Sequence, residues 1–247
     1  LLLPLAVPTF VMGFVFMATF DFAGPIQTAW RDLFGRGAYF PSIYQAWAVI
    51  LVMTLVLYPY VYILARAAFR EQAANTYEAS RVMGYSRAQT FWRLVLPLAR
   101  PSLAAGAVLA MMEALTDYGT VKFFSFPTLS EGIVRVWEGR FDRAGATELA
   151  SLLLIFAFGF LLLERALRGQ AKYYQSGSTK GRRMQRQHLQ GWKKWGAAAA
   201  LSFLLLVAFV LPVAQLAAWA IAEVQQQSVG ALQGVFFDYI SSSVTLA

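Results

Sequence analysis

The chain has 247 residues, of which 58% are hydrophobic and 14% are charged, and its formal net charge is +8. Soluble domains usually carry about 25% charged residues, so this composition argues against a soluble globular domain. The sequence contains no cysteine, which excludes a disulfide framework and a thiolate metal site within these residues. The positive charge suits either nucleic acid or an anionic membrane surface, and its distribution along the chain decides between them.

Apolar segments long enough to cross a bilayer recur along the chain. A spanning helix needs about 20 mostly apolar residues. The sequence predicts five such helices, at 1–20, 44–64, 101–116, 148–163 and 196–221. The fourth has an alternative start near residue 144, Pro212 is expected to kink the fifth, and a further apolar stretch begins near Ser243. The predicted fold is therefore all-α, a polytopic transmembrane helical bundle, and we expect the helices at both ends to continue beyond this sequence.

Lys and Arg alternate between the predicted loops. The loops at 65–100 and 164–195 are basic, whereas those at 21–43, 117–147 and 222–242 are neutral or acidic. Because Lys and Arg are retained on the cytoplasmic side of a membrane, we place the two basic loops in the cytoplasm and the other three outside. This alternation favours the membrane over nucleic acid as the partner of the positive charge.

The stretch at 169–195 is polar, basic and interrupted by Gly and Ser, as is typical of a linker between two membrane units. A basic arm for nucleic acid is the alternative interpretation. The apolar spans that flank the segment closely argue against that alternative, and no nucleic-acid partner is expected.

The cytoplasmic loop at 65–100 shows more order than a simple connector. The segment at 77–93 has few helix breakers, and its apolar residues follow a loose helical spacing. Gly84 permits a turn, and Pro97 is expected to end the second helix. The pattern therefore predicts two short helices joined at Gly84, which form a compact projection able to sit in a groove on a partner.

One pattern in this loop is specific. Glu78-Ala79-Ser80, three residues, Gly84, nine residues and Leu94-Val95-Leu96-Pro97 follow one another. This resembles the loop of ABC importer inner-membrane permeases that reads Glu-Ala-Ala, three residues, Gly, nine residues, Ile-x-Leu-Pro. Ser80 replaces the second Ala and Leu94 replaces Ile. The resemblance implies the type I permease fold, also called MetI-like, and a coupling helix that docks on a dimeric ATPase at the cytoplasmic face.

The resemblance carries the coupling role to nine residues, which are Glu78, Ala79, Ser80, Arg81, Gly84, Arg87, Leu94, Leu96 and Pro97. Arg81 and Arg87 are expected to offer charge to the ATPase. The sequence has no G-x-x-x-x-G-K-[S/T] motif, so ATP hydrolysis is expected in the partner and not in this chain. The resemblance also implies a periplasmic or lipoprotein substrate-binding protein and membrane lipid as partners, a bacterial inner-membrane location, and no cofactor.

The stretches PLAVPTFVMGFVF, FDFAGPIQTAWR, LVLYPYVYILARAAF and EALTDYGTVKFF resemble ferric-iron permeases, in which two permease halves are fused. On that resemblance, 1–168 is the C-terminal part of a first permease domain, 169–195 is a basic cytoplasmic linker and 196–247 begins a second permease domain. Other cargoes, such as thiamine, a polyamine or sulfate, remain alternatives. A membrane-bound enzyme and a non-transport membrane anchor or sensor are alternatives of other classes.

Glu113, Asp117 and Tyr118 lie at the outer end of the third predicted span. Acidic groups in or beside a membrane helix are usually functional, and carboxylate and phenolate oxygens are hard ligands suited to Fe³⁺. We expect the three to line a translocation pathway, with no resident metal because a permease must release its cargo. The alternative is that Asp117 caps a helix end and that Glu113 bonds a neighbouring helix.

The outer loop at 117–147 carries a further apolar group between Ile133 and Phe141. These residues predict a short interfacial helix, bracketed by Gly132 and Gly139. It is a candidate surface for the substrate-binding protein.

Overall fold

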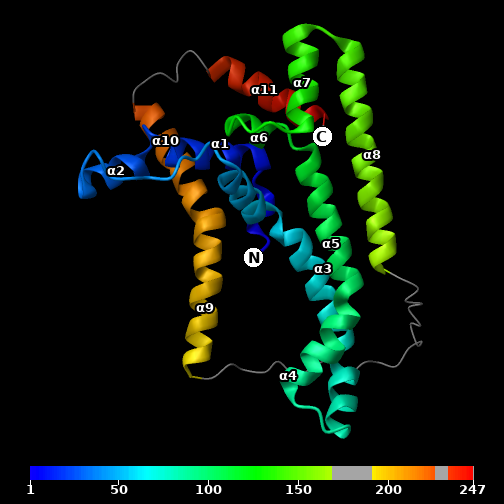
Figure 1. Ribbon diagram of the computed structural model, residues 1–247. Helices are drawn as coiled ribbons and strands as arrows, with labels where there is room; N and C mark the ends of the chain where they lie inside the picture. The colour runs from blue at the N-terminus through cyan, green and yellow to red at the C-terminus, as the bar shows by residue number, and fades with distance from the viewer. Residues whose placement is uncertain (169–190, 226–232, 247) are drawn as a thin grey trace.

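The computed structural model describes residues 1–168, 191–225 and 233–246, and within these ranges every regular element is a helix. Most of the linker predicted at 169–195 lies outside the described residues. The elements in chain order are η1 (Leu3–Ala6), α1 (Thr9–Phe20), α2 (Pro25–Phe34), α3 (Ala46–Val82), α4 (Arg87–Thr90), η2 (Phe91–Val95), α5 (Leu96–Thr116), α6 (Gly119–Phe123), α7 (Leu129–Arg140), α8 (Arg143–Arg168), α9 (Trp192–Leu205), η3 (Leu206–Val210), α10 (Leu211–Gln225) and α11 (Gln233–Leu246). The all-α prediction is confirmed. Figure 1 shows that the axes of the long helices α5, α8 and α9 are roughly aligned, with α8 antiparallel to α5.

Five helical segments of the described chain are long and apolar enough to cross a membrane. They are Thr9–Phe34, Ala46–Arg70, Arg87–Thr116, Arg143–Ala166 and Trp192–Glu223. Each overlaps one of the five spans predicted from the sequence, so their number and order are confirmed. Their limits differ, and the differences have local causes.

The prediction of one helix from residue 1 to Phe20 is wrong. The chain forms a short 3₁₀ helix, η1, and then extends at Val7 before α1 begins after Pro8. Pro8 disfavours the helical conformation in the residue before it, which is why the chain breaks at Val7. A second break at Gly24 separates α1 from α2, which lies crosswise to α9 in Figure 1.

The third span begins earlier than predicted. Pro97 does not end a helix: it is the second residue of α5, which continues to Thr116. The π-turn η2 precedes it, and the amide of Leu96 donates to the carbonyl of Phe91, five residues earlier. A proline lacks the amide donor and its ring clashes with the carbonyl four residues back, and the wider turn is a known way to accommodate such a break. The same sequence of a π-turn, Leu and Pro recurs at Leu206–Val210, Leu211 and Pro212, where a kink was expected.

The outer segments also contain more helix than expected. Asp142 accepts a hydrogen bond from the amide of Gly145 at 3.0 Å, and this cap sets the start of α8 at Arg143. That start agrees with the alternative near residue 144 and lies five residues before Glu148. A helix, α7, is present where one was predicted between Ile133 and Phe141, but it starts earlier, so that Gly132 and Gly139 lie inside it and do not bracket it. The helix α11 begins at Gln233, inside the stretch that was predicted as an outer loop up to residue 242.

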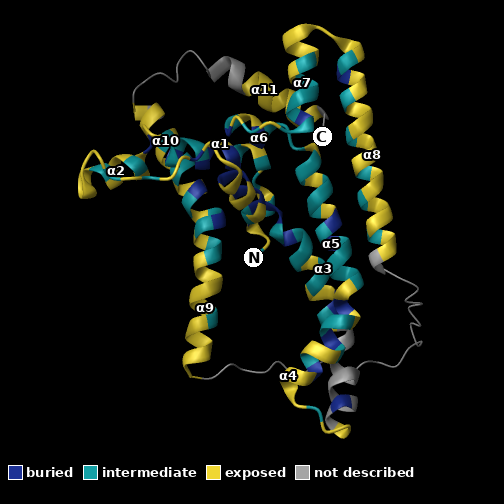
Figure 2. Cartoon of the chain, viewed as in Figure 1, coloured by how far each residue is buried: buried dark blue, intermediate teal, exposed yellow. Residues whose placement is uncertain are grey.

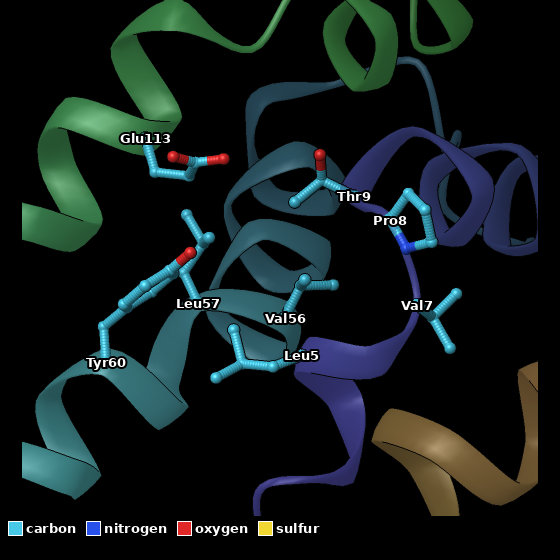
Figure 3. Close-up of a pocket in the computed structure, with 8 residues that line it drawn as sticks. All are labelled: Leu5, Val7, Pro8, Thr9, Val56, Leu57, Tyr60 and Glu113. Carbon is cyan, nitrogen blue, oxygen red and sulfur yellow. The ribbon is translucent and has the colours of Figure 1, made fainter. Parts of the chain in front are cut away.

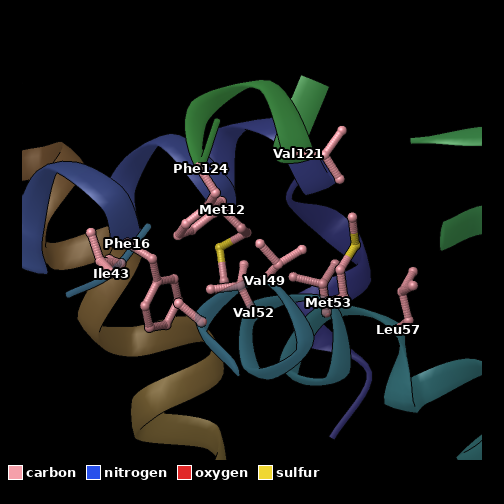
Figure 4. Close-up of a cluster of buried hydrophobic side chains, with 11 residues drawn as sticks. Met12, Phe16, Ile43, Val49, Val52, Met53, Leu57, Val121 and Phe124 are labelled. Carbon is pink, nitrogen blue, oxygen red and sulfur yellow. The ribbon is translucent and has the colours of Figure 1, made fainter. Parts of the chain in front are cut away.

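The buried core lies where α1, α3 and α6 meet, as Figure 4 shows. Met12 and Phe16 of α1 pack against a stripe of α3 and against Val121 and Phe124 of α6. The stripe on α3 consists of Ala48, Val49, Val52, Met53, Val56 and Leu57. By contrast, α8 exposes apolar side chains along most of its length (Figure 2), as a helix facing lipid or another membrane subunit does.

The helices α3 and α5 form the most extensive pair in the described structure. Gly106 of α5 allows this packing, because a Cβ atom there would lie 2.8 Å from the Cα of Val61 and 3.2 Å from the carbonyl oxygen of Tyr60. Both atoms belong to the backbone of α3 and have no flexible side chain that can move aside. A glycine is therefore required at this position for α3 and α5 to approach so closely.

We expect Gly106→Ala to lower the free energy of unfolding by about 1–3 kcal/mol, because the added methyl group overpacks the contact between α3 and α5. Gly159→Ala on α8 is the matched control, since a Cβ there meets nothing within 4 Å. It should leave stability unchanged or raise it by up to about 1 kcal/mol through helix propensity. Denaturant unfolding of the two purified variants in the same detergent measures the difference, and equal responses would contradict the packing argument.

Candidate functional site

Two parts of the described chain collect the residues singled out from the sequence. The first is the turn between α3 and α4, at the foot of the molecule in Figure 1. The second is a cavity between η1, α1, α3 and α5. The same two helices, α3 and α5, connect them.

The turn is built around Gly84, whose φ of +80° favours glycine. The amide of Tyr85 donates to the carbonyl of Ser80 at 3.0 Å across this turn. The turn at Gly84 is confirmed, but the prediction of two separate short helices is wrong. The first is the end of α3, which continues unbroken from Ala46 to Val82, and the second leads through η2 directly into α5.

A capping box begins α4. The hydroxyl of Ser86 accepts from the amide of Gln89 at 3.3 Å, and the amide of Ser86 donates to Oε1 of Gln89 at 2.9 Å. This reciprocal pair satisfies two amides that the first turn of a helix leaves without partners. It fixes where the chain re-enters a helix after Gly84.

A buried hydrogen bond joins the two sides of the turn. The hydroxyls of Ser80 and Thr90 are both inaccessible to solvent and lie 2.9 Å apart. The Thr90 hydroxyl also lies 3.0 Å from the carbonyl oxygen of Ser86. A buried polar pair of this kind costs free energy when one member is removed, so the bond ties α3 to α4 across the turn. Ser80 was predicted from the sequence as part of the coupling loop, but Thr90 was not, because a spacing of ten residues gives no helical or strand signal.

Apolar side chains cover the tip of the turn. Val82 is 90% exposed and Met83 is 62% exposed. Trp92, also exposed, lies away from the tip in η2, where its ring is 5.4 Å from Phe91, which in turn lies 6.0 Å from Phe69 of α3. Apolar groups exposed together at the end of a projection are typical of an interaction surface.

The remaining residues of the predicted coupling set lie along the same segment. Glu78, Ala79 and Arg81 belong to the last turns of α3, and their side chains lie outside the described part of the structure. Arg87 is exposed at the start of α4. Leu94 lies in η2, and Leu96 and Pro97 are the first two residues of α5, all three half-buried. Arg87 is therefore available at the surface of the turn, whereas Leu94, Leu96 and Pro97 form the connection from the turn to α5.

The cavity has a volume of about 190 Å³ and is lined by Leu5, Val7, Pro8, Thr9, Val56, Leu57, Tyr60 and Glu113. Figure 3 shows Glu113 from α5, Tyr60 from α3 and Thr9 from α1 around one opening. Glu113 is the one charged residue among these eight, and Tyr60 and Thr9 contribute the hydroxyl groups. Tyr60 and Thr9 were not predicted as lining residues, because nothing in the sequence shows which face of a span points inward.

The structure separates the three residues expected in the pathway. Glu113 lines the cavity, but Asp117 and Tyr118 do not. Both carboxylate oxygens of Asp117 accept hydrogen bonds from Thr120, from its amide and from its hydroxyl, each at 2.7 Å. Asp117 therefore caps the start of α6, and its backbone carbonyl accepts from the hydroxyl of Ser130 at 3.0 Å.

Tyr118 packs beside α6 and faces a lysine. The ammonium of Lys122 lies 5.1 Å from the centre of the Tyr118 ring. The hydrogen bond with Tyr118 is the main reason that the pKa of Lys122 is raised above its ordinary value. Through this contact and the cap, Tyr118 and Asp117 stabilise the connection between α5 and α6.

Many known proteins resemble this chain, and three of them show the range of their transport functions. The Fe(3+)-transport system permease protein FbpB 2 of Haemophilus influenzae is 25% identical over 228 residues, which cover 92% of this chain and 41% of that protein. The putative molybdenum transport system permease protein YvgM of Bacillus subtilis is 31% identical over 124 residues, covering 50% of this chain and 53% of that protein. The sulfate transport system permease protein CysT of Synechococcus elongatus is 28% identical over 178 residues, covering 70% of this chain and 62% of that protein.

The chain thus spans between about two fifths and three fifths of the length of these relatives. No solved structure gives a significant match. Residues 1–219 match the family described as binding-protein-dependent transport system inner membrane component. With most of its length inside that match and five segments able to span a membrane, the chain belongs to this family of multi-pass ABC importer permeases.

Proposed function

We propose that the chain forms part of the membrane pathway of an ABC importer for ferric iron. The observation that carries the choice of cargo is Glu113 in the cavity between α1, α3 and α5. A carboxylate with two hydroxyl groups offers the hard oxygen ligands that suit Fe³⁺. Sulfate and molybdate are anions and would be repelled by this carboxylate, so the cavity favours the ferric relatives over the oxyanion relatives.

We further propose that the turn at Gly84 is the site at which an ATPase subunit binds the permease. The exposed apolar tip formed by Val82 and Met83 supports this, because apolar side chains exposed together are typical of a surface that a partner protein covers. The buried bond between Ser80 and Thr90 makes the tip move together with α3 and α4. Because α4 leads through η2 into α5, a displacement of the tip is thereby transmitted to α3 and α5, which both line the cavity.

The basic segments of the chain support a cytoplasmic position for this turn. On this topology the cavity lies between the turn and the outer surface of a bacterial inner membrane, and α7 faces outward, where a substrate-binding protein docks. The proposed division of the chain is a first permease domain ending at residue 168, a basic linker at 169–195 and a second permease domain from 196. ATP hydrolysis takes place in the ATPase subunit.

Replacing Gly84 tests the coupling role. We expect Gly84→Leu to reduce transport and substrate-stimulated ATP hydrolysis together by about tenfold or more, because a side chain at φ +80° strains the turn and changes the docking surface. A Cβ at Gly84 meets no atom within 4 Å, so the helix pair itself should remain folded. The measurement is transport and ATPase activity of the whole importer in proteoliposomes.

Gly35→Leu is the matched control for this experiment. Gly35 also has a positive φ, of +92°, and open space around it, but it follows α2 on the proposed outer side. It should therefore retain coupling. Full transport by the Gly84 variant, or an equal loss in both variants, would contradict the assignment of the turn.

Replacing Glu113 tests the cargo. We expect Glu113→Gln to lower the rate of Fe³⁺ uptake by at least about tenfold, which corresponds to about 1.4 kcal/mol of lost electrostatic stabilisation. Glu148→Gln on α8 removes an exposed carboxylate away from the cavity and should transport iron normally. Uptake of labelled iron in the presence of excess sulfate or molybdate completes the measurement. Competition by either oxyanion would refute the ferric assignment, and normal iron uptake by the Glu113 variant would refute the role of Glu113 in the pathway.

A further inference from the structure

The helix α2 has one apolar and one polar face. Ile26, Trp30, Leu33 and Phe34 recur at spacings of four, three and one residues, which places them on one side of an α-helix. The opposite side carries Gln27, Thr28, Arg31 and Asp32. At ten residues, or about 15 Å, α2 is far too short to cross a bilayer, although it follows α1 directly.

The polar face ties α2 to the end of α1. The side-chain amide of Gln27 donates to the carbonyl of Phe20 at 3.1 Å, and Nη2 of Arg31 donates to the carbonyl of Phe22 at 2.7 Å. The guanidinium of Arg31 also lies 4.0 Å from the centre of the Phe22 ring. These contacts turn the polar face toward the preceding chain and fix the direction of the helix.

Gly24 makes this arrangement possible at the junction. A Cβ on Gly24 would lie 2.5 Å from the carbonyl oxygen of Thr19 and 2.6 Å from that of Ala18. The close approach lets the chain leave α1 and start α2 within four residues. The orientation of α2 is therefore set by the end of the membrane segment and not by a long flexible loop.

The apolar face points away from the rest of the described structure. Leu33 is 78% exposed and Phe34 is 63% exposed, and Figure 2 colours much of α2 as exposed. Trp30 stacks within the segment itself, with its ring 4.2 Å from Phe34 and 6.1 Å from Phe40. The result is an exposed apolar surface on α2 that contains the aromatic rings of Trp30 and Phe34.

We propose that this face of α2 lies in lipid, at the boundary between headgroups and acyl chains of the outer leaflet. Two observations favour lipid as the occupant. The helix directly follows α1, with which it makes up the first candidate membrane segment, and its apolar face carries Trp30, a residue type enriched at membrane interfaces. Short amphipathic helices bind membranes in this orientation.

The substrate-binding protein is the competing occupant. Such a protein dissociates during each transport cycle and would leave Leu33 and Phe34 in water between cycles, whereas lipid covers them throughout. The outer-leaflet position rests on the proposed topology, in which the loop at 21–43 faces outward. The lipid contact itself does not depend on the identity of the cargo.

The experiment uses the importer in proteoliposomes, with a spin label on a single introduced cysteine. The sequence contains no cysteine, so the labelled positions within this chain are unique once cysteines elsewhere in the importer are replaced. Leu33→Cys and Phe34→Cys report on the apolar face, and Thr28→Cys is the control on the polar face. Collisions with oxygen, which is enriched in lipid, are compared with collisions with a water-soluble nickel complex, before and after the binding protein is added.

We expect labels at positions 33 and 34 to collide with oxygen severalfold more than the label at position 28, and with the nickel complex severalfold less, before any binding protein is present. Equal nickel accessibility at positions 33 and 28 would overturn the proposal. Protection of position 33 that appears only after the binding protein is added would overturn it as well and would identify a protein docking face. Iron uptake and ATPase activity of the labelled importers are recorded separately, so a failure of the cargo or coupling proposals remains distinguishable from a failure of this one.

Discussion

The contact between the backbones of α3 and α5 at Gly106 is the constraint on which the rest of the arrangement depends. It holds two long helices together, and both proposed sites are divided between them. Tyr60 of α3 and Glu113 of α5 line the same cavity, and Ser80 near the end of α3 bonds Thr90 just before α5. A closely packed pair has few ways to deform internally, so a displacement at the turn reaches the cavity as a movement of both helices.

The sequence predicts the large-scale organisation well because bilayer thickness imposes long apolar segments and topology imposes a bias of Lys and Arg. Those signals are enough for the five spans, and a glycine that interrupts a helical pattern is enough for the turn at Gly84. Helix limits were less predictable, since they depend on local hydrogen bonding. Pro97 resembles a helix terminator in the sequence, but the π-turn before it allows the helix to continue. The limit at Arg143 depends on a single cap from Asp142.

Side-chain roles were predictable only in part, because a spacing does not reveal which neighbour a group will meet. Glu113 and Asp117 are one turn apart and were expected to act together. Thr120 engages both oxygens of Asp117, whereas Glu113 lines the cavity with residues from α1 and α3. The difference arises from the end of α5 at Thr116: Glu113 is still helical, and Asp117 has already left the helix.

The length of α3 has a mechanical consequence. Its 37 residues correspond to about 55 Å, whereas the hydrocarbon core of a bilayer is about 30 Å thick. Tyr60 lies about 21 Å from the start of the helix, and Val82 lies about 54 Å from it. Pro59 lies inside α3 directly before Tyr60, where a proline removes an amide donor and bends a helix, and the upper part of α3 runs obliquely to its lower part in Figure 1. The part from Tyr60 to Val82 is about 33 Å long, so a displacement of its far end changes the angle between the two parts of α3 beside the cavity.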